Sequence, residues 1–351
     1  MAERKQYASL DIMKFIMAML ILTQHTANEW AHSTGLVHAF FGLGNFAVPF
    51  FFACSGFLFF SKLNTLSADE QKGYYKKWSL RIGKMYLIWS LIYFVFVLYG
   101  WIDRGVTIDG VGRYLHRVLV FSTYATIWFL PALWVGVSIC YWMKKHCSSM
   151  LMWIAMVLLM VIGNLFGSYS NVILESCPGM VSFYDGYMDW FITWRNGVFN
   201  GAPYVFIGIL VAEGWGKKNI SVKVSALFAV LFAFAFICEA FCISRFKLSS
   251  ATDMGFMMAP AIYFLMKFLV SPQITLPTSI VWTYCRNLSM LIFLGQRLFL
   301  TALPGMFPAM AKWIGGFSEG GVFVYFLVVV LTFSFLIIKL SNRYKVLKNL
   351  W

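Results

Sequence analysis

The stretch MKFIMAMLILTQHTANEW, residues 13–30, decides the fold class of this protein. It is long enough and apolar enough to cross a bilayer, which takes about 20 mostly apolar residues in a helix. The stretch nevertheless carries Lys14 near one end, and His25 and Glu29 near the other. Ionisable groups at membrane depth are costly and usually face a cavity or a partner, so these three side chains are candidates for function.

The composition of the whole chain agrees with a membrane protein. Of its 351 residues, 60% are hydrophobic and only 12% are charged, whereas a soluble domain is about half apolar and a quarter charged. The net charge is +14, but the basic residues come in short clusters between apolar runs. This pattern is typical of membrane topology and not of a phosphate-binding groove. We therefore expect a protein of the lipid bilayer with no nucleic-acid partner.

The apolar runs predict an all-α fold, a polytopic membrane helix bundle of about ten transmembrane helices. The expected spans lie near residues 9–29, 40–60, 80–100, 126–143, 149–167, 197–213, 222–242, 253–270, 280–301 and 321–340. Lysines and arginines are concentrated in the segments on the same side as the N-terminus, and cytoplasmic loops carry such an excess. Both termini are therefore expected in the cytoplasm. No internal repeat or low-complexity linker divides residues 1–351, which are expected to form a single domain.

Lys14 and His25 are eleven residues apart, which places them on nearly the same helix face, about 16 Å apart along the axis. Glu29 follows His25 by four residues and could fix the tautomer of its ring. The alternative is a lysine that reaches the interface and a histidine that is hydrogen-bonded in a helix contact. A metal site at His25, Glu29 and His32 is also conceivable, but no further ligand completes the cluster, so no metal is expected.

Other polar residues lie in or beside the later spans. Ser55-Gly56 in VPFFFACSGFLFF predicts a close approach of two helices. Arg81 and Lys84, one turn apart at the cytoplasmic mouth of the third span, could hold a phosphate-bearing ligand. Trp128 stands out in TIWFLPALW.

Two further pairs are candidates for substrate binding, Arg286 with Asn287 and Arg195 with Asn196. Arg286 lies well inside an apolar segment and needs a partner there. Glu239 and Glu29 both qualify, and the sequence spacing does not choose between them.

Four stretches, in this order, resemble the acyltransferase-3 family of bacterial membrane proteins: SLDIMKFIMAMLILTQHT, VPFFFACSGFLFF, KKWSLRIGKMYLIWSLIY and TIWFLPALWVG. Two later stretches, WRNGVFNGAPYVFIGILVAE and RNLSMLIFLG, resemble the membrane domain that is joined to serine racemases in vancomycin-resistance systems. That domain belongs to the same superfamily.

The resemblance implies a multi-pass protein of the bacterial cytoplasmic (plasma) membrane that takes acyl groups from cytoplasmic acyl-CoA, with acetyl-CoA as the expected donor. The acceptor would be a hydroxyl of an envelope carbohydrate or a similar molecule at the outer face. The family's catalytic histidine falls on His25. Its basic residue eleven positions earlier is usually arginine, and here it is Lys14, which keeps the charge but loses bidentate phosphate binding.

The family's other motifs fall on Arg81 with Lys84, on Ser55 with the two residues that follow it, and on Trp128. The resemblance implies that they bind the donor. The sequence thus predicts a membrane-bound O-acyltransferase in which His25 is the general base and Glu29 orients it.

The alternative is a transporter or delivery module for a small amino acid such as serine. In that case Arg286 and a carboxylate would bind the zwitterion. The oligomeric state, a homodimer included, stays open.

Overall fold

The structure is a computed structural model that describes residues 7–31, 42–214, 220–249, 251–274, 276–277 and 279–351. Over these residues the chain forms helices joined by turns and loops, and no β-strand. The predicted all-α fold is confirmed. The chain divides into two compact units, which are described separately below. The prediction that residues 1–351 form a single domain stays a prediction.

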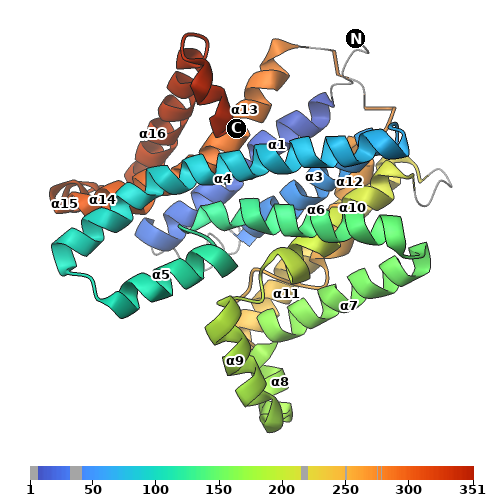
Figure 1. Ribbon diagram of the computed structural model, residues 1–351, viewed down its shortest axis with the longest axis horizontal. Helices are drawn as coiled ribbons and strands as arrows, with labels where there is room; N and C mark the ends of the chain where they lie inside the picture. Colours follow the sequence, from blue (N-terminus) through green and yellow to red (C-terminus); the bar gives the residue numbers. More distant parts are fainter. Residues whose placement is uncertain (1–6, 32–41, 215–219, 250, 275, 278) are drawn as a thin grey trace. The chain divides into compact units, whose positions relative to one another are not determined.

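The first unit combines Met1–Ala47, Leu80–Trp128 and Leu276–Trp351. Three of its helices, α1, α13 and α16, pack against one another (Figure 1). Its described elements are α1 (Ala8–Thr26), η1 (Ala27–Ala31), η2 (Gly42–Phe46), the later part of α4 (Ala68–Arg104), α5 (Ile108–Val120), η3 (Thr126–Trp128), α13 (Ile280–Arg297), η6 (Leu298–Ala302), α14 (Leu303–Met306), α15 (Pro308–Gly315), α16 (Glu319–Leu340) and η7 (Lys345–Leu350).

The second unit combines Val48–Ser79 and Phe129–Thr275. Helix α10 is central to it, because it packs against α6, α7 and α12. Its described elements are α3 (Ala47–Leu63), the beginning of α4, α6 (Phe129–His146), α7 (Ser149–Gly167), α8 (Ser170–Ser176), η4 (Pro178–Met180), α9 (Val181–Phe191), η5 (Gly197–Gly201), α10 (Ala202–Ala212), α11 (Val222–Arg245) and α12 (Met258–Leu269).

Local sequence explains where several of the long helices begin. A serine precedes α7, α11, α13 and α16, and its hydroxyl accepts a hydrogen bond from a backbone N–H of the first turn. The first N–H groups of a helix have no partner within the helix, so such a cap stabilises the start by about 1 kcal/mol. The four caps are Ser148, Ser221, Ser279 and Ser318.

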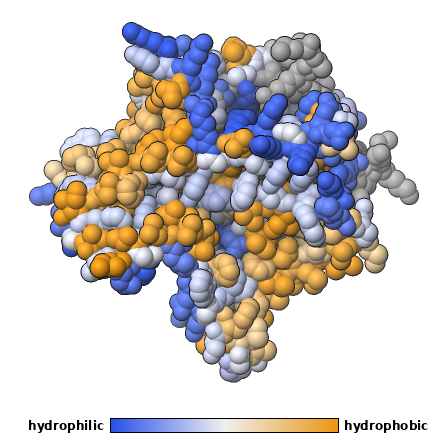
Figure 2. Space-filling model, viewed as in Figure 1, coloured by the Kyte–Doolittle hydropathy of each residue, from blue (hydrophilic) through white to orange (hydrophobic). Residues whose placement is uncertain are grey.

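Seven helices in the described part of the chain are long and apolar enough to cross a membrane. They lie at Gly42–Leu63, Ala68–Arg104, Thr126–His146, Ser149–Gly167, Val222–Arg245, Ile280–Met306 and Glu319–Leu340. Broad apolar areas lie on the exposed surface of the protein (Figure 2), as expected of a protein surrounded by lipid. The multi-pass membrane class is therefore supported by the structure.

The three remaining predicted spans are helical but do not meet the same criterion. Helix α1 covers the span predicted at 9–29, but it contains the polar residues Asp11, Lys14, Gln24 and His25. The spans predicted at 197–213 and 253–270 correspond to shorter apolar helices, Gly197–Ala212 and Met258–Leu269. The count of ten and the cytoplasmic position of both termini stay predictions.

The predicted close approach at Ser55-Gly56 is found within the second unit, between α3 and α10. A Cβ atom added to Gly56 would lie 2.4 Å from the backbone oxygen of Val205, and one added to Gly208 would lie 2.1 Å from that of Ala53. Neither backbone can yield to a side chain without moving its helix. Glycine at both positions therefore lets the two helices touch through their backbones, as small residues do in membrane bundles.

Gly208→Ala is expected to destabilise the protein by at least about 1–3 kcal/mol, because overpacking here strains the backbone. Gly73→Ala is the matched control, since a Cβ at Gly73 on α4 would meet nothing within 4 Å and alanine favours a helix more than glycine does. Thermal unfolding in detergent should show a lower midpoint for Gly208→Ala alone. Equal midpoints for the two variants would contradict the close contact.

Candidate active site at the ends of two parallel helices

Helices α1 and α13 of the first unit run parallel and side by side (Figure 1). Their parallel direction follows from two contacts, because residue numbers rise together along both segments: His25 contacts Gln296, and Trp30, further on, contacts Leu300. The indole N–H of Trp30 donates to the Leu300 carbonyl at 2.9 Å. Two helices that run parallel in one membrane begin on the same side of it, which agrees with the predicted first and ninth spans.

The His25 ring is held by Gln296. Its Nδ1 lies 3.1 Å from the side-chain Oε1 of Gln296, a residue that is completely buried. The Gln296 amide nitrogen donates to the Phe293 carbonyl at 3.1 Å, so the amide oxygen is the atom that faces His25. An oxygen only accepts, and Nδ1 must therefore carry the proton. In the neutral form of such a ring the lone pair is on Nε2, the atom that a general base uses.

Glu29 makes its ion pair with a different residue. Arg297 Nη1 donates to Glu29 Oε1 at 2.6 Å, and the exposed fractions of the two side chains are 14% and 39%. The α-helix ends at Thr26, and residues 27–31 form a π-helical turn, which is wider than an α-helical turn. The spacing of four between His25 and Glu29 therefore no longer spans a single α-helical turn. The side chain hydrogen-bonded to Nδ1 of His25 is that of Gln296, and the orienting role predicted for Glu29 stays a prediction.

Lys14 lies toward the other end of α1. Its ammonium group donates to Asp11 at 3.3 Å, and the exposed fractions of the two side chains are 13% and 6%. Because α1 is continuous over Ala8–Thr26, the predicted separation of about 16 Å between Lys14 and His25 holds. Any phosphate that Lys14 binds must share it with Asp11 or displace that carboxylate.

Arg286 and Asn287 also lie at the Lys14 end. Arg286 precedes Gln296 by ten residues on α13, about 15 Å along the helix. Since the two helices are parallel, Arg286 is level with Lys14 and distant from the His25 ring. The partners suggested from the sequence are engaged elsewhere. Glu29 pairs with Arg297, and Glu239 accepts from the Tyr169 hydroxyl and two backbone N–H groups within the second unit.

The remaining predicted donor-binding residues of the first unit lie on different elements. Arg81 and Lys84 are both exposed on α4, and Arg81 Nη2 donates to the carbonyl of Trp351 at 3.3 Å. Trp128 is buried and stacks on Phe121 with ring centroids 6.0 Å apart. None of these three side chains lines either of the two cavities described below.

Ser55, Arg195 and Asn196 belong to the second unit. Ser55 lies half-buried on α3, and Arg195 forms an ion pair with Asp253. The Asn196 side chain accepts from two backbone N–H groups at the start of η5 and donates to the Tyr187 hydroxyl. Asn196 therefore has a capping role that accounts for its polarity.

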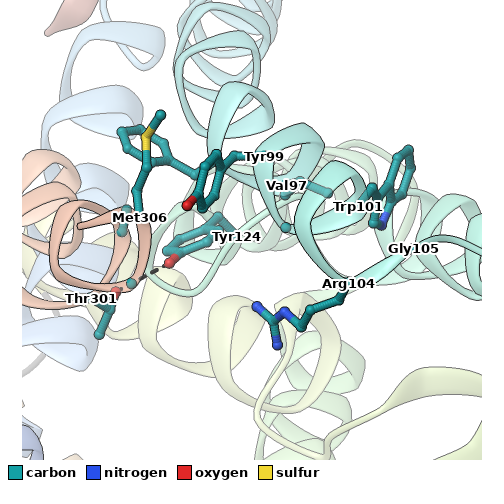
Figure 3. A pocket seen from close by; sticks show the side chains of 12 residues that line it. Val97, Tyr99, Trp101, Arg104, Gly105, Tyr124, Thr301 and Met306 are labelled. Carbon is teal, nitrogen blue, oxygen red and sulfur yellow. Dashed lines mark hydrogen bonds between the residues drawn. The ribbon is translucent and has the colours of Figure 1, made fainter. Parts of the chain in front are cut away.

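Two cavities open near the His25 end of the first unit. The larger, of about 480 Å³, is lined by the end of α4, by Tyr124 and by residues 301–306. Tyr124 and Thr301 share a hydrogen bond of 3.2 Å across it (Figure 3). The smaller, of about 370 Å³, is lined by Arg117 and Arg297 among others. Both cavities include Val97, Tyr124 and Thr301, so they adjoin one another.

The end of α13 and the following η6 connect these cavities to the residue that holds the histidine. Gln296 contacts the His25 ring, Arg297 lines the smaller cavity, and Thr301 lines both cavities. The Thr301 hydroxyl donates to the Arg297 carbonyl at 3.0 Å, which fixes it one turn further on. Neighbouring residues of α13, Gln296 and Arg297, therefore contact the His25 ring and line the smaller cavity.

Sequence reasoning missed Gln296, Arg297, Tyr124 and Asp11. A signal was present for Gln296 and Arg297, because a polar pair interrupts the run LIFLGQR at the end of an apolar span. Polar residues at membrane depth are unusual enough to be candidates by themselves. Nothing in the local sequence distinguishes Tyr124 from other tyrosines of this aromatic chain.

A metal site has no support in the described part of the chain, where no three His, Cys, Asp or Glu side chains are placed to hold an ion. His32, the third residue of the conceivable metal cluster, lies outside the described residues.

Comparisons with known proteins find relatives of this chain. An amino-acid racemase of Enterococcus faecalis is 25% identical over 283 residues, which cover 77% of this chain and 37% of the relative. A serine/alanine racemase of Enterococcus gallinarum is 22% identical over 264 residues, 74% of this chain and 37% of the relative. The chain thus spans less than half the length of these curated relatives. No solved structure matches it.

The match to a family model is more extensive. The model, described as an acyltransferase domain (Acyl_transf_3), matches residues 7–339 and so runs through both compact units. The resemblance noted in the N-terminal stretches is confirmed, and the chain belongs to the acyltransferase-3 family.

Proposed function

We propose that this protein is a membrane-bound O-acyltransferase, with acetyl-CoA as donor and a hydroxyl of an envelope carbohydrate or similar molecule as acceptor. The observation that carries the proposal is the pairing of His25 with Gln296. It directs the Nδ1 proton of the His25 ring to Gln296 at the end of α1, and the residue after Gln296, Arg297, lines a cavity that can admit a substrate. Membership of an acyltransferase family supports the same reaction.

The proposed reaction needs one base. His25 Nε2 takes the proton of the acceptor hydroxyl while that oxygen attacks the thioester carbonyl. The C–O bond of the ester forms, the C–S bond breaks, and the imidazolium returns its proton to the departing thiolate. Gln296 would hold the ring in the required tautomer throughout, as the carboxylate does in a serine protease triad.

Acyl-CoA would enter from the cytoplasmic side, with its phosphates near Lys14 and its thioester near His25. The axial distance of about 16 Å between these residues suits an extended pantetheine arm. Arg286, level with Lys14, adds a guanidinium that can bind phosphate in a bidentate manner. It compensates for lysine where the family usually has arginine. We propose Arg81, Lys84, Ser55 and Trp128 as further donor contacts from the resemblance alone.

The second candidate function is transport or delivery of a small amino acid such as serine. It is favoured by the names of the relatives, which include a serine/alanine racemase and amino-acid racemases. In this function His25 would couple the movement of a proton to that of the zwitterion, and Arg286 would bind its carboxylate.

Vesicles containing the purified protein separate the two functions. We expect acetyl-CoA on the cytoplasmic side to release free thiol in proportion to acetyl ester formed on an added carbohydrate. Radiolabelled serine should not accumulate above the level of empty vesicles. Serine accumulation without thiol release would reverse the assignment.

A further inference from the structure

The two adjoining cavities at the His25 end are rich in arginine. Arg104 lines the larger cavity, and Arg117 and Arg297 line the smaller. Neither cavity has an Asp or Glu among its lining residues, and among the described residues Glu29 is the carboxylate that pairs with one of the three arginines, Arg297. Three guanidinium groups against one carboxylate leave an excess positive charge, which favours an anionic ligand.

The guanidinium groups of these arginines have N–H donors that can bind a ligand. Within the described residues, Arg104 and Arg117 form no ion pair. The Nε atom of Arg297 is buried without a hydrogen-bond partner there. An unsatisfied buried donor is costly and calls for a ligand or another explanation. The guanidinium of Arg104 extends toward the side of the cavity where Tyr124 and Thr301 lie (Figure 3).

The remaining lining is aromatic and hydroxylated. Tyr99, Trp101 and Tyr124 line the larger cavity together with the Thr301 hydroxyl. Tyr124 is held flat by Tyr93, with ring centroids 4.5 Å apart and planes at 14°. Tyr93 is itself fixed by donating its hydroxyl proton to the Leu294 carbonyl at 2.7 Å. A rigid aromatic wall suits the apolar face of a ring, and the hydroxyls suit its polar edge.

Size and charge together select a class of ligand. Each cavity, at about 480 and 370 Å³, is in the range of roughly 300–1,000 Å³ typical of ligands much larger than serine. A zwitterion would also need a free carboxylate for its ammonium group, and the lining residues supply none.

We propose that these cavities form the acceptor site and that the acceptor is an anionic sugar, one that carries a carboxylate or a phosphate. This inference rests on the proposed acyl transfer and names its substrate class. Arg104 and Arg117 bind the anionic group, and the tyrosines and Trp101 contact the sugar ring. Arg297, next to Gln296 on α13, brings the ligand to the turn that also holds the His25 ring.

Binding without any acyl donor tests the site independently of catalysis. The probes are glucuronate and glucose 6-phosphate, with neutral glucose and L-serine as comparisons, titrated against the full chain in nanodiscs by calorimetry. We expect wild type and His25→Ala to bind an anionic sugar alike, and glucose and serine at least about ten-fold more weakly. Binding should weaken as salt is raised.

Arg104→Gln and Arg117→Gln are expected to weaken binding of the anionic sugar by about ten-fold or more. Arg113→Gln is the matched control, because Arg113 lies one turn before Arg117 on α5 but pairs with Asp109, whereas Arg117 lines the smaller cavity. It should change the affinity by no more than about two-fold. If Arg104→Gln does not fold, Arg104→Lys keeps the charge, loses bidentate geometry and should weaken binding to a lesser degree.

Tighter binding of serine or glucose than of either sugar anion, or equal losses in Arg113→Gln and the cavity variants, would overturn the inference. Failure of acyl transfer has a different signature. If the protein binds the sugar anions through Arg104 and Arg117 but releases no thiol from acetyl-CoA, the anionic-sugar site is supported and the proposed acyl transfer is wrong.

Discussion

His25→Ala is expected to lower the rate of acetyl transfer by about 10²–10⁴-fold, the usual contribution of a positioned general base. The methyl group of alanine cannot take the acceptor's proton, so the hydroxyl must attack the thioester unassisted. Folding should be affected much less, because the His25 ring is only half-buried. Thiol release from acetyl-CoA in vesicles, measured together with thermal unfolding, tests both statements.

His146→Ala is the control for this prediction. His146 is exposed near the end of α6 in the second unit, so the same substitution there should leave acetyl transfer unchanged. If His25→Ala retained the activity of His146→Ala, the imidazole would not be the base.

Gln296→Leu is expected to lower the rate of acetyl transfer by at least about ten-fold. Gln296 is a positioning residue, because its side chain contacts Nδ1 of His25 and not the nitrogen that takes the proton. Leucine fills a similar volume but cannot accept from Nδ1–H, so the ring loses its preferred tautomer and orientation. Loss of the residue that orients a catalytic or ligating histidine commonly costs 10-fold to 10⁴-fold. The variant also leaves the Phe293 carbonyl without its donor, so its unfolding temperature must be measured alongside.

Gln296→Glu distinguishes positioning from packing. A carboxylate still accepts the proton of Nδ1, but it loses the amide N–H that Phe293 accepts, as leucine does. We therefore expect glutamate to restore much of the activity that leucine removes, with a similar loss of stability in both variants. Activities that follow stability in both would assign Gln296 a structural role only.

Glu29→Gln should reduce activity less than Gln296→Leu does. Glutamine at position 29 keeps a hydrogen bond to Arg297 but not the full ion pair, and the 39% exposure of Glu29 makes that pair the weaker interaction. A larger loss for Glu29→Gln would return the orienting role to the residue that the sequence first suggested.

The sequence by itself determined the class of the protein and the contents of its first helix. Apolar runs of membrane length must be helical, because every backbone polar group in lipid has to be paired within the segment. The distance between Lys14 and His25 followed directly from the rise of a continuous helix. The four N-terminal stretches also indicated the family, because a family resemblance depends only on the residues and their order. These are all properties of local sequence.

Only the tertiary structure decided which side chains meet. His25 and Gln296 are separated by 271 residues, and Glu29 and Arg297 by 268. No spacing rule reaches so far, because such contacts depend on how α1 and α13 align when they pack. Because of that alignment, Arg286 lies at the Lys14 end of α1, and the side chain hydrogen-bonded to Nδ1 of His25 is the amide of Gln296. The candidate base, His25, can be recognised from the sequence of α1 alone, but the residues around its ring come from both α1 and α13.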